Sequence, residues 1–277
     1  IGESTGLECL KILIKLKRLD IFLVVSVDQK YHKIIKKMCK KNKINFITSI
    51  FFKKKFKKIK FLKENNYFLL SVFSNLIIKK DFLKKFEGRA FNFHPGLLPY
   101  YPGKNCVSGA LYNEEKKSGV TLHVMTPSVD KGEIIKKKII KISSRDNLIT
   151  LMLKLKLCCI DLFKNFSKDL SNGKRFRRFS NNKTLKKKYP KYIPYKGKID
   201  QNMDFSEFKK LFRASYFGPY KSTWGRPFIK FKKSYKNIVN IKKIKLNKKT
   251  NAQFVQKIDN NNFLLNFKEK IAIVEVI

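Results

Sequence analysis

The chain has 277 residues, 43% of them hydrophobic, which is enough for one large domain and a smaller one. No apolar run approaches the roughly 20 residues that cross a bilayer, so the sequence argues against a membrane span, and its first residues show no signal-peptide pattern. The five cysteines are scattered without paired metal-ligand spacing, which favours free thiols in a reducing cytoplasm.

The formal net charge of +44 is extreme and comes almost entirely from lysine, because only eight of the 64 basic residues are Arg. Arg is the side chain that best reads bases and phosphates. The lysine excess goes together with abundant Asn, Ile and Phe, as an AT-rich gene would produce. Two explanations stay open: drift of a solvated surface towards lysine, which we favour, and a functional footprint for RNA.

The first predicted elements alternate between helix and buried strand. A helical period covers residues 7–16, and the apolar run 21–25 is typical of a buried parallel strand. A basic amphipathic helix is predicted over residues 29–42 and a short strand over 45–48. The Lys- and Phe-rich run 51–60 has no clear period and is expected on the surface.

A second buried strand is predicted over residues 67–72. It leads into a loop that contains Asn75, Leu76 and Ile77, and then into a helix over residues 79–86. A flat heteroaromatic ligand would need an apolar slot of this kind, although an ordinary strand-to-helix loop explains the same residues.

The strand 91–93 carries the first candidate catalytic side chains. Asn92 and His94 should project from one face of it, at the carboxyl end where Pro95 and Gly96 stop the strand. His94 can exchange a proton near neutral pH, and the Asn92 amide can donate to an oxygen that gains negative charge. Asp130 could orient His94 and stabilise its charged form. A capped strand with a core histidine and a solvated Asp is the plain alternative.

Further helices and strands follow this site. A helix is predicted over residues 106–115, strands over 119–125 and 134–142, and a long helix over 147–166. In the strand 119–125, Thr121, His123 and Met125 share one face, so His123 could support the site without reacting, or simply pack as a hydrogen-bonded core residue.

Composition changes near Ser167, and residues 171–194 are predicted to form a basic linker. Beyond it we expect a helix near residues 206–214 with Ser206 as its N-cap. Residues 227–277 alternate apolar and polar, which predicts short antiparallel strands in a small β-barrel or sheet.

Three motifs carry a resemblance to a known family. They are Asn-x-His-x-x-Leu-Leu-Pro at residues 92–99, Gly-Val-Thr-x-His-x-Met at 119–125 and Asp-x-Gly-x-Ile-Ile at 130–135. Their order and spacing resemble the signature of the formyltransferases that use 10-formyltetrahydrofolate, which act on methionyl-tRNA, glycinamide ribonucleotide or amino sugars. The resemblance implies that Asn92, His94 and Asp130 are the catalytic trio, with 10-formyltetrahydrofolate as co-substrate and no metal.

The resemblance also implies an architecture. It is an α/β fold: a Rossmann-like formyltransferase domain over residues 1–170 with a mainly parallel sheet, the linker 171–194, and a helix with a β-rich module over 195–277. Family members begin with one more central strand, which here would lie before Ile1, so we expect the chain to be incomplete at its N-terminus. A cytoplasmic protein without a membrane span is expected, and a homodimer is compatible with the resemblance. The positions that match folate-contacting residues of the family are Asn75, Leu76, Ile77, Lys104, Thr126, Pro127, Ser128 and Val129.

The motifs specify the acceptor of the formyl group less well than the donor. Tyr101-Pro102-Gly103-Lys104-Asn105 and His123 depart from the pattern of methionyl-tRNA formyltransferases and look more like sugar N-formyltransferases. We therefore favour a nucleotide-linked amino sugar. Initiator methionyl-tRNA is the alternative, because the basic surface and the C-terminal β module would suit it. A third possibility is an inactive folate- or RNA-binding module on the same fold.

Overall fold

The computed structural model describes residues 3–55, 59, 67–86, 88–181, 189–218, 222–246 and 253–277. Parts of three predicted segments lie outside these residues: the run 51–60, the linker 171–194 and the strand region 227–277. The chain divides into two compact units. The first comprises Ile1–Gly103, Lys117–Ile140 and Lys154–Lys187, and the second comprises Lys104–Lys116, Lys141–Leu153 and Lys188–Ile277.

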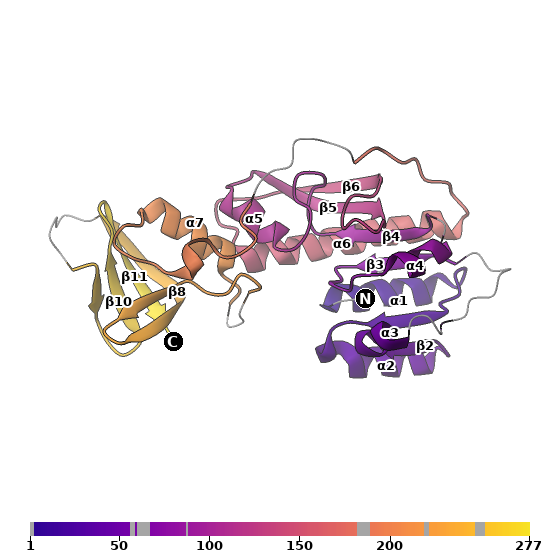
Figure 1. Cartoon of the computed structure of the whole chain (residues 1–277), viewed down its shortest axis with the longest axis horizontal. Helices are drawn as coiled ribbons and strands as arrows, with labels where there is room; N and C mark the ends of the chain where they lie inside the picture. The colour runs from indigo at the N-terminus through magenta and orange to yellow at the C-terminus, as the bar shows by residue number, and fades with distance from the viewer. Residues whose placement is uncertain are drawn as a thin grey trace. The chain divides into compact units, whose positions relative to one another are not determined.

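The first unit alternates helices and strands, as its apolar periods predict (Figure 1). Its helices are α1 (Glu3–Leu16), η1 (Gln29–Tyr31), α2 (His32–Lys41), α3 (Ser49–Lys55), α4 (Lys80–Leu83), η3 (Lys84–Phe86) and most of α6 (Leu148–Ser171). Its strands are β1 (Leu23–Ser26), β2 (Asn45–Thr48), β3 (Leu69–Val72), β4 (Ala90–His94), β5 (Lys117–Val124) and β6 (Ile134–Lys141).

The strands of the first unit form a mixed α/β architecture. β1 and β2 pair in parallel, and the second sheet has the order β3-β4-β5-β6. In it β3 and β4 are parallel, whereas β4 and β5 are antiparallel. The connection from β5 to β6 is a short loop, too short for the crossover that a parallel pair would need. The α/β Rossmann-like class is therefore confirmed, with a sheet that is parallel only in its first part.

A cavity of about 520 Å³ lies between β1 and β3, which belong to different sheets. Consecutive residues of both strands line it, together with Leu10 and Leu13 of α1 and Phe163 and Leu170 of α6.

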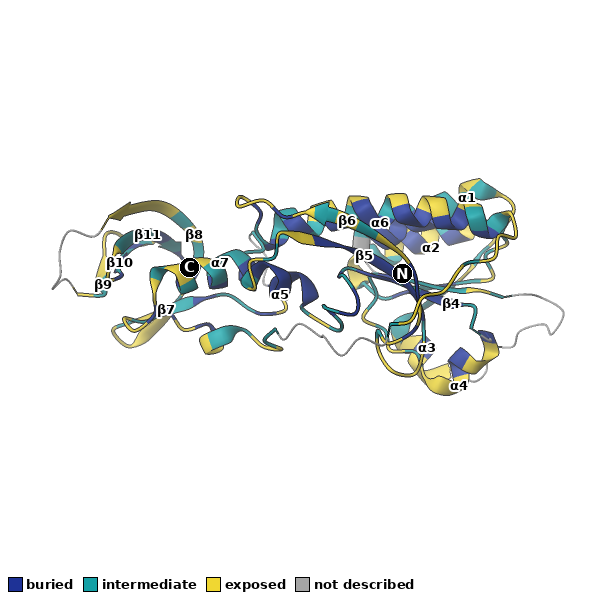
Figure 2. Ribbon diagram, turned by 90° about the horizontal axis from the view of Figure 1, so that it is seen from above, coloured by how far each residue is buried: buried dark blue, intermediate teal, exposed yellow. Residues whose placement is uncertain are grey.

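The core of the first unit lies where α6 covers the sheet. The Phe93 ring of β4 packs on Phe163 and Phe166, at centroid distances of 5.1 and 5.7 Å. Figure 2 shows α6 with alternating buried and exposed residues, as expected of a helix that covers a sheet with one face. Because Phe93 points into this core, its neighbours Asn92 and His94 must point to the opposite face of β4.

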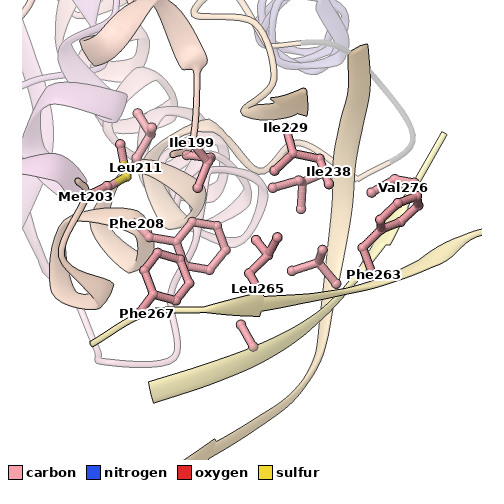
Figure 3. Close-up of a cluster of buried hydrophobic side chains, with 12 residues drawn as sticks. Ile199, Met203, Phe208, Leu211, Ile229, Ile238, Phe263, Leu265, Phe267 and Val276 are labelled. Atoms are coloured by element: carbon pink, nitrogen blue, oxygen red, sulfur yellow. The ribbon is translucent and has the colours of Figure 1, made fainter. Parts of the chain in front are cut away.

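The second unit is a helix-covered antiparallel sheet with the strand order β7-β8-β11-β10-β9. Its elements are α5 (Cys106–Tyr112), η4 (Pro194–Gly197), α7 (Phe205–Ser215), β7 (Phe228–Phe231), β8 (Ser234–Leu246), β9 (Val255–Lys257), β10 (Asn262–Asn266) and β11 (Lys270–Val276). Phe208 and Leu211 of α7 belong to one buried cluster with Phe263, Leu265 and Phe267 (Figure 3). The predicted β-rich C-terminal region is thus confirmed.

The predicted N-cap of α7 is wrong. The helix begins at Phe205, and Asp204 holds the N-cap position in an extended conformation. The Asp204 carbonyl accepts the first helical hydrogen bond, from the Phe208 N–H at 3.0 Å. Ser206 therefore lies inside the first turn. Among the described residues, no helix combines the length and the apolar character needed to span a membrane.

Candidate active site

The candidate site is built on the carboxyl end of β4. In the β4–β5 pairing, Asn92 lies opposite His123 and His94 lies opposite Thr121. His94 and His123 are buried, with 4% and 2% of their surface exposed. The predicted pair of side chains on one face of this strand is therefore present, and β5 adds His123 to it.

Asp130 joins these residues into one polar cluster, although it is distant from them in the sequence. Its Oδ2 atom lies 3.3 Å from His94 Nδ1, and its Oδ1 atom lies 3.4 Å from His123 Nε2. The Asn92 amide Nδ2 lies 3.1 Å from the same His123 nitrogen. The structure thus brings together the three side chains that the sequence singles out, with His123 between Asn92 and Asp130.

Backbone carbonyls define the tautomers of the two histidines. His123 Nδ1 lies 2.8 Å from the Val124 carbonyl oxygen and must donate to it, so Nε2 accepts from Asn92 when the ring is neutral and donates to Asp130 Oδ1 when the ring is protonated. His94 Nε2 lies 2.7 Å from the Tyr101 carbonyl oxygen and must donate to that group. One amide hydrogen of Asn92 therefore holds His123, and its second amide hydrogen remains for another acceptor.

Burial and charge act in opposite directions on the central pair. Burial raises the pKa of Asp130, but the contacts with His123, with His94 and with the Gly103 N–H together lower it to about 2. Burial lowers the pKa of His94, while the Asp130 carboxylate and the Tyr101 carbonyl partly oppose that change. The cluster therefore combines an ionised carboxylate with an imidazole that gives up its proton readily.

A tight turn closes one side of the cluster. The Thr121 hydroxyl donates to the Gly96 carbonyl at 2.7 Å and accepts from the Leu98 N–H at 3.1 Å. A Cβ atom on Gly96 would lie 2.8 Å from His94 Nε2 and 2.8 Å from the Tyr101 oxygen, so only glycine fits without displacing one of them. The Gly103 N–H donates to Asp130 Oδ2 at 2.7 Å. The turn therefore fixes both ring and carboxylate.

A cavity of about 180 Å³ opens beside Asp130. Its lining residues come from the turn after β4, from the β5–β6 loop and from the segment after α6: Pro99, Pro102, Gly103, Val129, Asp130, Lys131 and Asn181. A reacting group bound here would lie next to the carboxylate of the cluster.

The predicted folate-contacting residues lie in three parts of the structure: the β5–β6 loop, the β3–α4 loop and the segment that contains Lys104. Val129 lines the cavity, and the same loop contains Thr126, Pro127 and Ser128, where the Thr126 hydroxyl donates to the Ser128 carbonyl at 2.8 Å. The β3–α4 loop leaves the sheet at the same edge as His94, because Val72 of β3 pairs in parallel with Phe93 of β4.

That β3–α4 loop contains Asn75, Leu76 and Ile77. The Leu76 N–H donates to Ser74 Oγ at 3.1 Å, whereas the Ile77 side chain is exposed. Lys104 belongs to the second unit, in which the Tyr189 hydroxyl donates to its carbonyl. The ligand contacts of all these residues stay predictions. No group of three or more metal-ligating side chains occurs in the described ranges.

The fold and this cluster define a Rossmann-like α/β domain with an imidazole–carboxylate site at the end of a central strand. Residues 24–158 match the family model described as formyl transferase. The stretch that carries the site is thus similar to the formyl transferase family.

Two curated proteins illustrate the sequence relationship. The bifunctional polymyxin resistance protein ArnA of Wigglesworthia glossinidia brevipalpis is 29% identical over 216 residues, which cover 76% of this chain and 32% of ArnA. The methionyl-tRNA formyltransferase of Borreliella burgdorferi (strain ZS7) is 42% identical over 79 residues, which cover 28% of this chain and 25% of that enzyme. The chain thus spans about a third and a quarter of these relatives.

Solved structures share the fold over nearly the whole chain. An N-formyltransferase from Helicobacter canadensis, in complex with folinic acid and dTDP-3-aminofucose, has a TM-score of 0.71 at 21% identity and covers 99% of this chain and 97% of its own. WlaRD, a sugar 3N-formyltransferase in the presence of dTDP and 5-N-formyl-THF, has a TM-score of 0.68 at 18% identity, with 99% and 94% coverage. At these identities the likeness shows the fold.

Proposed function

We propose that this chain transfers a formyl group from 10-formyltetrahydrofolate to the primary amine of a nucleotide-linked amino sugar. The observation that carries the proposal is the convergence of Asn92, His94 and Asp130 beside a cavity in a formyl transferase domain. The folate donor is suggested by the family and by the folate compounds named for two structural neighbours. The amino-sugar acceptor is suggested by the dTDP-linked sugar named for one of them.

Each side chain has a step that its chemistry suits. The acceptor amine attacks the formyl carbon, and the carbonyl oxygen becomes negatively charged in the tetrahedral intermediate. The second amide hydrogen of Asn92 donates to that oxygen. His94 takes the proton that the amine loses, and Asp130 stabilises the resulting imidazolium. Collapse of the intermediate then breaks the bond to the folate nitrogen, which needs a proton that the His94–Asp130 pair can return.

The hydrogen bond from His94 Nε2 to the Tyr101 carbonyl sets a condition on this scheme. Nε2 can accept a proton only in the tautomer whose proton is on Nδ1, where Asp130 Oδ2 accepts it. In that tautomer Nε2 faces the carbonyl oxygen with a lone pair, which is repulsive. The catalytic state therefore requires the Tyr101 carbonyl to turn away and the acceptor amine to take its place.

Methionyl-tRNA formylation is the second candidate. The methionyl-tRNA formyltransferase of Borreliella burgdorferi has the higher identity of the two curated relatives, although over a shorter stretch. The net charge of +44 would also attract a polyanionic acceptor.

Acceptor profiling with the purified chain tests the proposal. Formyl transfer from 10-formyltetrahydrofolate is measured against a panel of nucleotide-linked amino sugars and against charged initiator tRNA. We expect turnover with a nucleotide-linked amino sugar, and a His94→Ala loss of at least about 100-fold, the usual scale for removal of an acid–base group. His32→Ala, on α2 and outside the cluster, is the matched control.

Three results would contradict the proposal. Turnover with tRNA alone would favour the second candidate. Folate binding without turnover on any acceptor would favour an inactive binding module. Wild-type turnover in His94→Ala, with native circular dichroism, would remove His94 from the mechanism.

A further inference from the structure

The segment that follows α6 returns to the sheet at the site. The Ile134 N–H donates to the Phe179 carbonyl, and the Phe179 N–H donates to the Ile134 carbonyl, both at 2.8 Å. This antiparallel bridge fixes the segment against the first residue of β6. Two residues further along, Asn181 lies against the loop that carries Asp130.

The Asn181 side chain binds two carbonyls of this loop. Its Nδ2 atom donates to the Asp130 carbonyl oxygen at 2.9 Å and to the Gly132 carbonyl oxygen at 3.0 Å. Both partners can only accept, so the nitrogen of the amide must face them and its orientation is determined. Both amide hydrogens are thereby used.

The oxygen of the same amide is oriented differently. Asn181 Oδ1 is buried and has no hydrogen-bond partner within the described ranges. Asn181 also lines the 180 Å³ cavity, together with Asp130 and Lys131. Because this oxygen has almost no accessible surface, a ligand in the cavity cannot reach it, and the amide acts on the site through its two N–H donors.

Asp130 needs such support because its backbone is in the left-handed region, with φ of 54°. A residue with a side chain adopts this conformation only where its surroundings hold it. The Gly103 N–H holds the carboxylate at Oδ2, and Asn181 holds the main chain on both sides of Lys131.

We propose that Asn181 is a positioning residue that holds Asp130 against His94 and His123 through its hydrogen bonds to the Asp130 and Gly132 carbonyls. This inference rests on the proposed formyl transfer for its kinetic part. It extends the site to a segment after α6, which lies beyond the residues 24–158 that match the family model.

Two substitutions test the donor role. Asn181→Asp keeps the shape of the side chain but removes both donors, and Asn181→Leu removes every polar atom of the side chain. We expect kcat to fall at least about tenfold in both variants, because small displacements of reacting groups are costly.

The pH profile gives a readout that a merely structural residue would not move. His94 is faced by Asp130, by His123 and by the Tyr101 carbonyl, and of these the Asp130 charge raises the pKa of His94 most. Loosening Asp130 removes part of that effect. The acidic limb of kcat/KM should therefore move to lower pH in Asn181→Leu.

Hydrogen–deuterium exchange of the loop 125–133, measured without substrate, tests the positioning directly. Exchange should be faster in both Asn181 variants and unchanged in Asn172→Leu, a control at an exposed Asn just after α6. Unchanged exchange, or wild-type kcat and pH profile in both variants, would overturn the proposal.

If Asn181→Leu fails to fold, Asn181→Asp still carries the exchange and kcat tests. If the wild-type chain shows no formyl transfer, the proposed function fails while the exchange result still decides the role of Asn181.

Discussion

Gly96 has room for a hydrogen atom and little more, because a Cβ atom would lie 2.8 Å from both His94 Nε2 and the Tyr101 oxygen. Gly96→Ala should therefore displace the His94 ring or fill the space beside Nε2 that the acceptor amine needs, and lower kcat/KM at least about tenfold. Gly173→Ala is the informative contrast: φ is +72° there, but no atom lies within 4 Å of the new Cβ. That variant should lose about 1 kcal/mol of stability and keep its activity. Equal activity in both variants would contradict the constraint on His94.

The buried His94 should also make stability depend on pH. Burial lowers its pKa in the folded chain, so below the ordinary histidine pKa of about 6.5 the unfolded chain binds a proton that the folded chain does not. Stability should then fall as pH decreases from about 7.5 to 5. Asp130, with its pKa lowered to about 2, adds a separate loss that begins only near pH 4.

Urea unfolding between pH 7.5 and 5 measures this dependence. In His94→Gln the midpoint should fall less steeply with decreasing pH than in the wild type, and His32→Gln should keep the wild-type slope. A slope in His94→Gln that equals the wild-type slope would show that His94 titrates similarly in the folded and unfolded chain.

At the scale of single residues, the sequence predicts what is local and misses what is tertiary. Asn92 and His94 can be placed on one face because strand alternation is a local rule. Asp130 can be proposed from its chemistry, but the motif resemblance is what favours it over a solvated Asp. Asn181 was not singled out, because it lies 51 residues from Asp130 and contacts only backbone oxygens there, which leave no trace in the sequence pattern. The role of Thr121 was equally hidden.

Most elements are predictable because they have a clear apolar period, but α3 (Ser49–Lys55) extends into the run 51–60, which has none. The predicted strand 119–125 is β5 (Lys117–Val124), and the predicted helix 147–166 is α6 (Leu148–Ser171). The apolar period of a strand does not indicate whether the strand pairs in parallel or antiparallel with its neighbour. The antiparallel pairing of β4 and β5 depends on how the chain between them is routed, not on the composition of either strand.

The cavity between β1 and β3 leads to a prediction about an added strand. Both strands run within parallel pairs, and Leu10 and Leu13 of α1 line the cavity. A strand placed there and followed by α1 and β1 would form a right-handed βαβ unit, the connection that parallel sheets almost always use. We expect an engineered Val/Ile-rich segment of about six residues, fused ahead of α1 through a short loop, to pair with both strands.

Thermal unfolding and amide exchange check this expectation. The extended chain should unfold several degrees higher, on the scale of about 4 °C for each kcal/mol gained, and the amides of β1 and β3 should exchange more slowly. An extension of the same length made of Gly and Ser is the control. If the Val/Ile segment slows amide exchange in neither β1 nor β3, the cavity does not accept a strand.

At the scale of the whole molecule, the positive net charge is the dominant feature. The lysine and arginine side chains of the chain are widely distributed over the described residues. The outer half of β8 is an example, where Lys242, Lys243 and Lys245 are all exposed. Exposed lysines attract any polyanion without reading its sequence. The described structure therefore leaves both explanations of the charge open, and salt dependence can separate them.

RNA binding to this chain should be electrostatic and separate from catalysis. If the surface only attracts phosphates, affinity for initiator tRNA, elongator tRNA and unrelated single-stranded RNA should be similar at low salt. All three affinities should then fall together as salt rises, with a slope of log K against log salt of about −0.7 for each neutralised phosphate on a single strand. Formyl transfer to a nucleotide-linked amino sugar, which carries few charges, should change far less over the same range.

Filter binding and turnover measured in parallel between about 50 and 200 mM salt make the comparison. Initiator-specific binding that survives the higher salt, together with formylation of its methionyl group, would instead make the basic surface part of acceptor recognition and tRNA the acceptor.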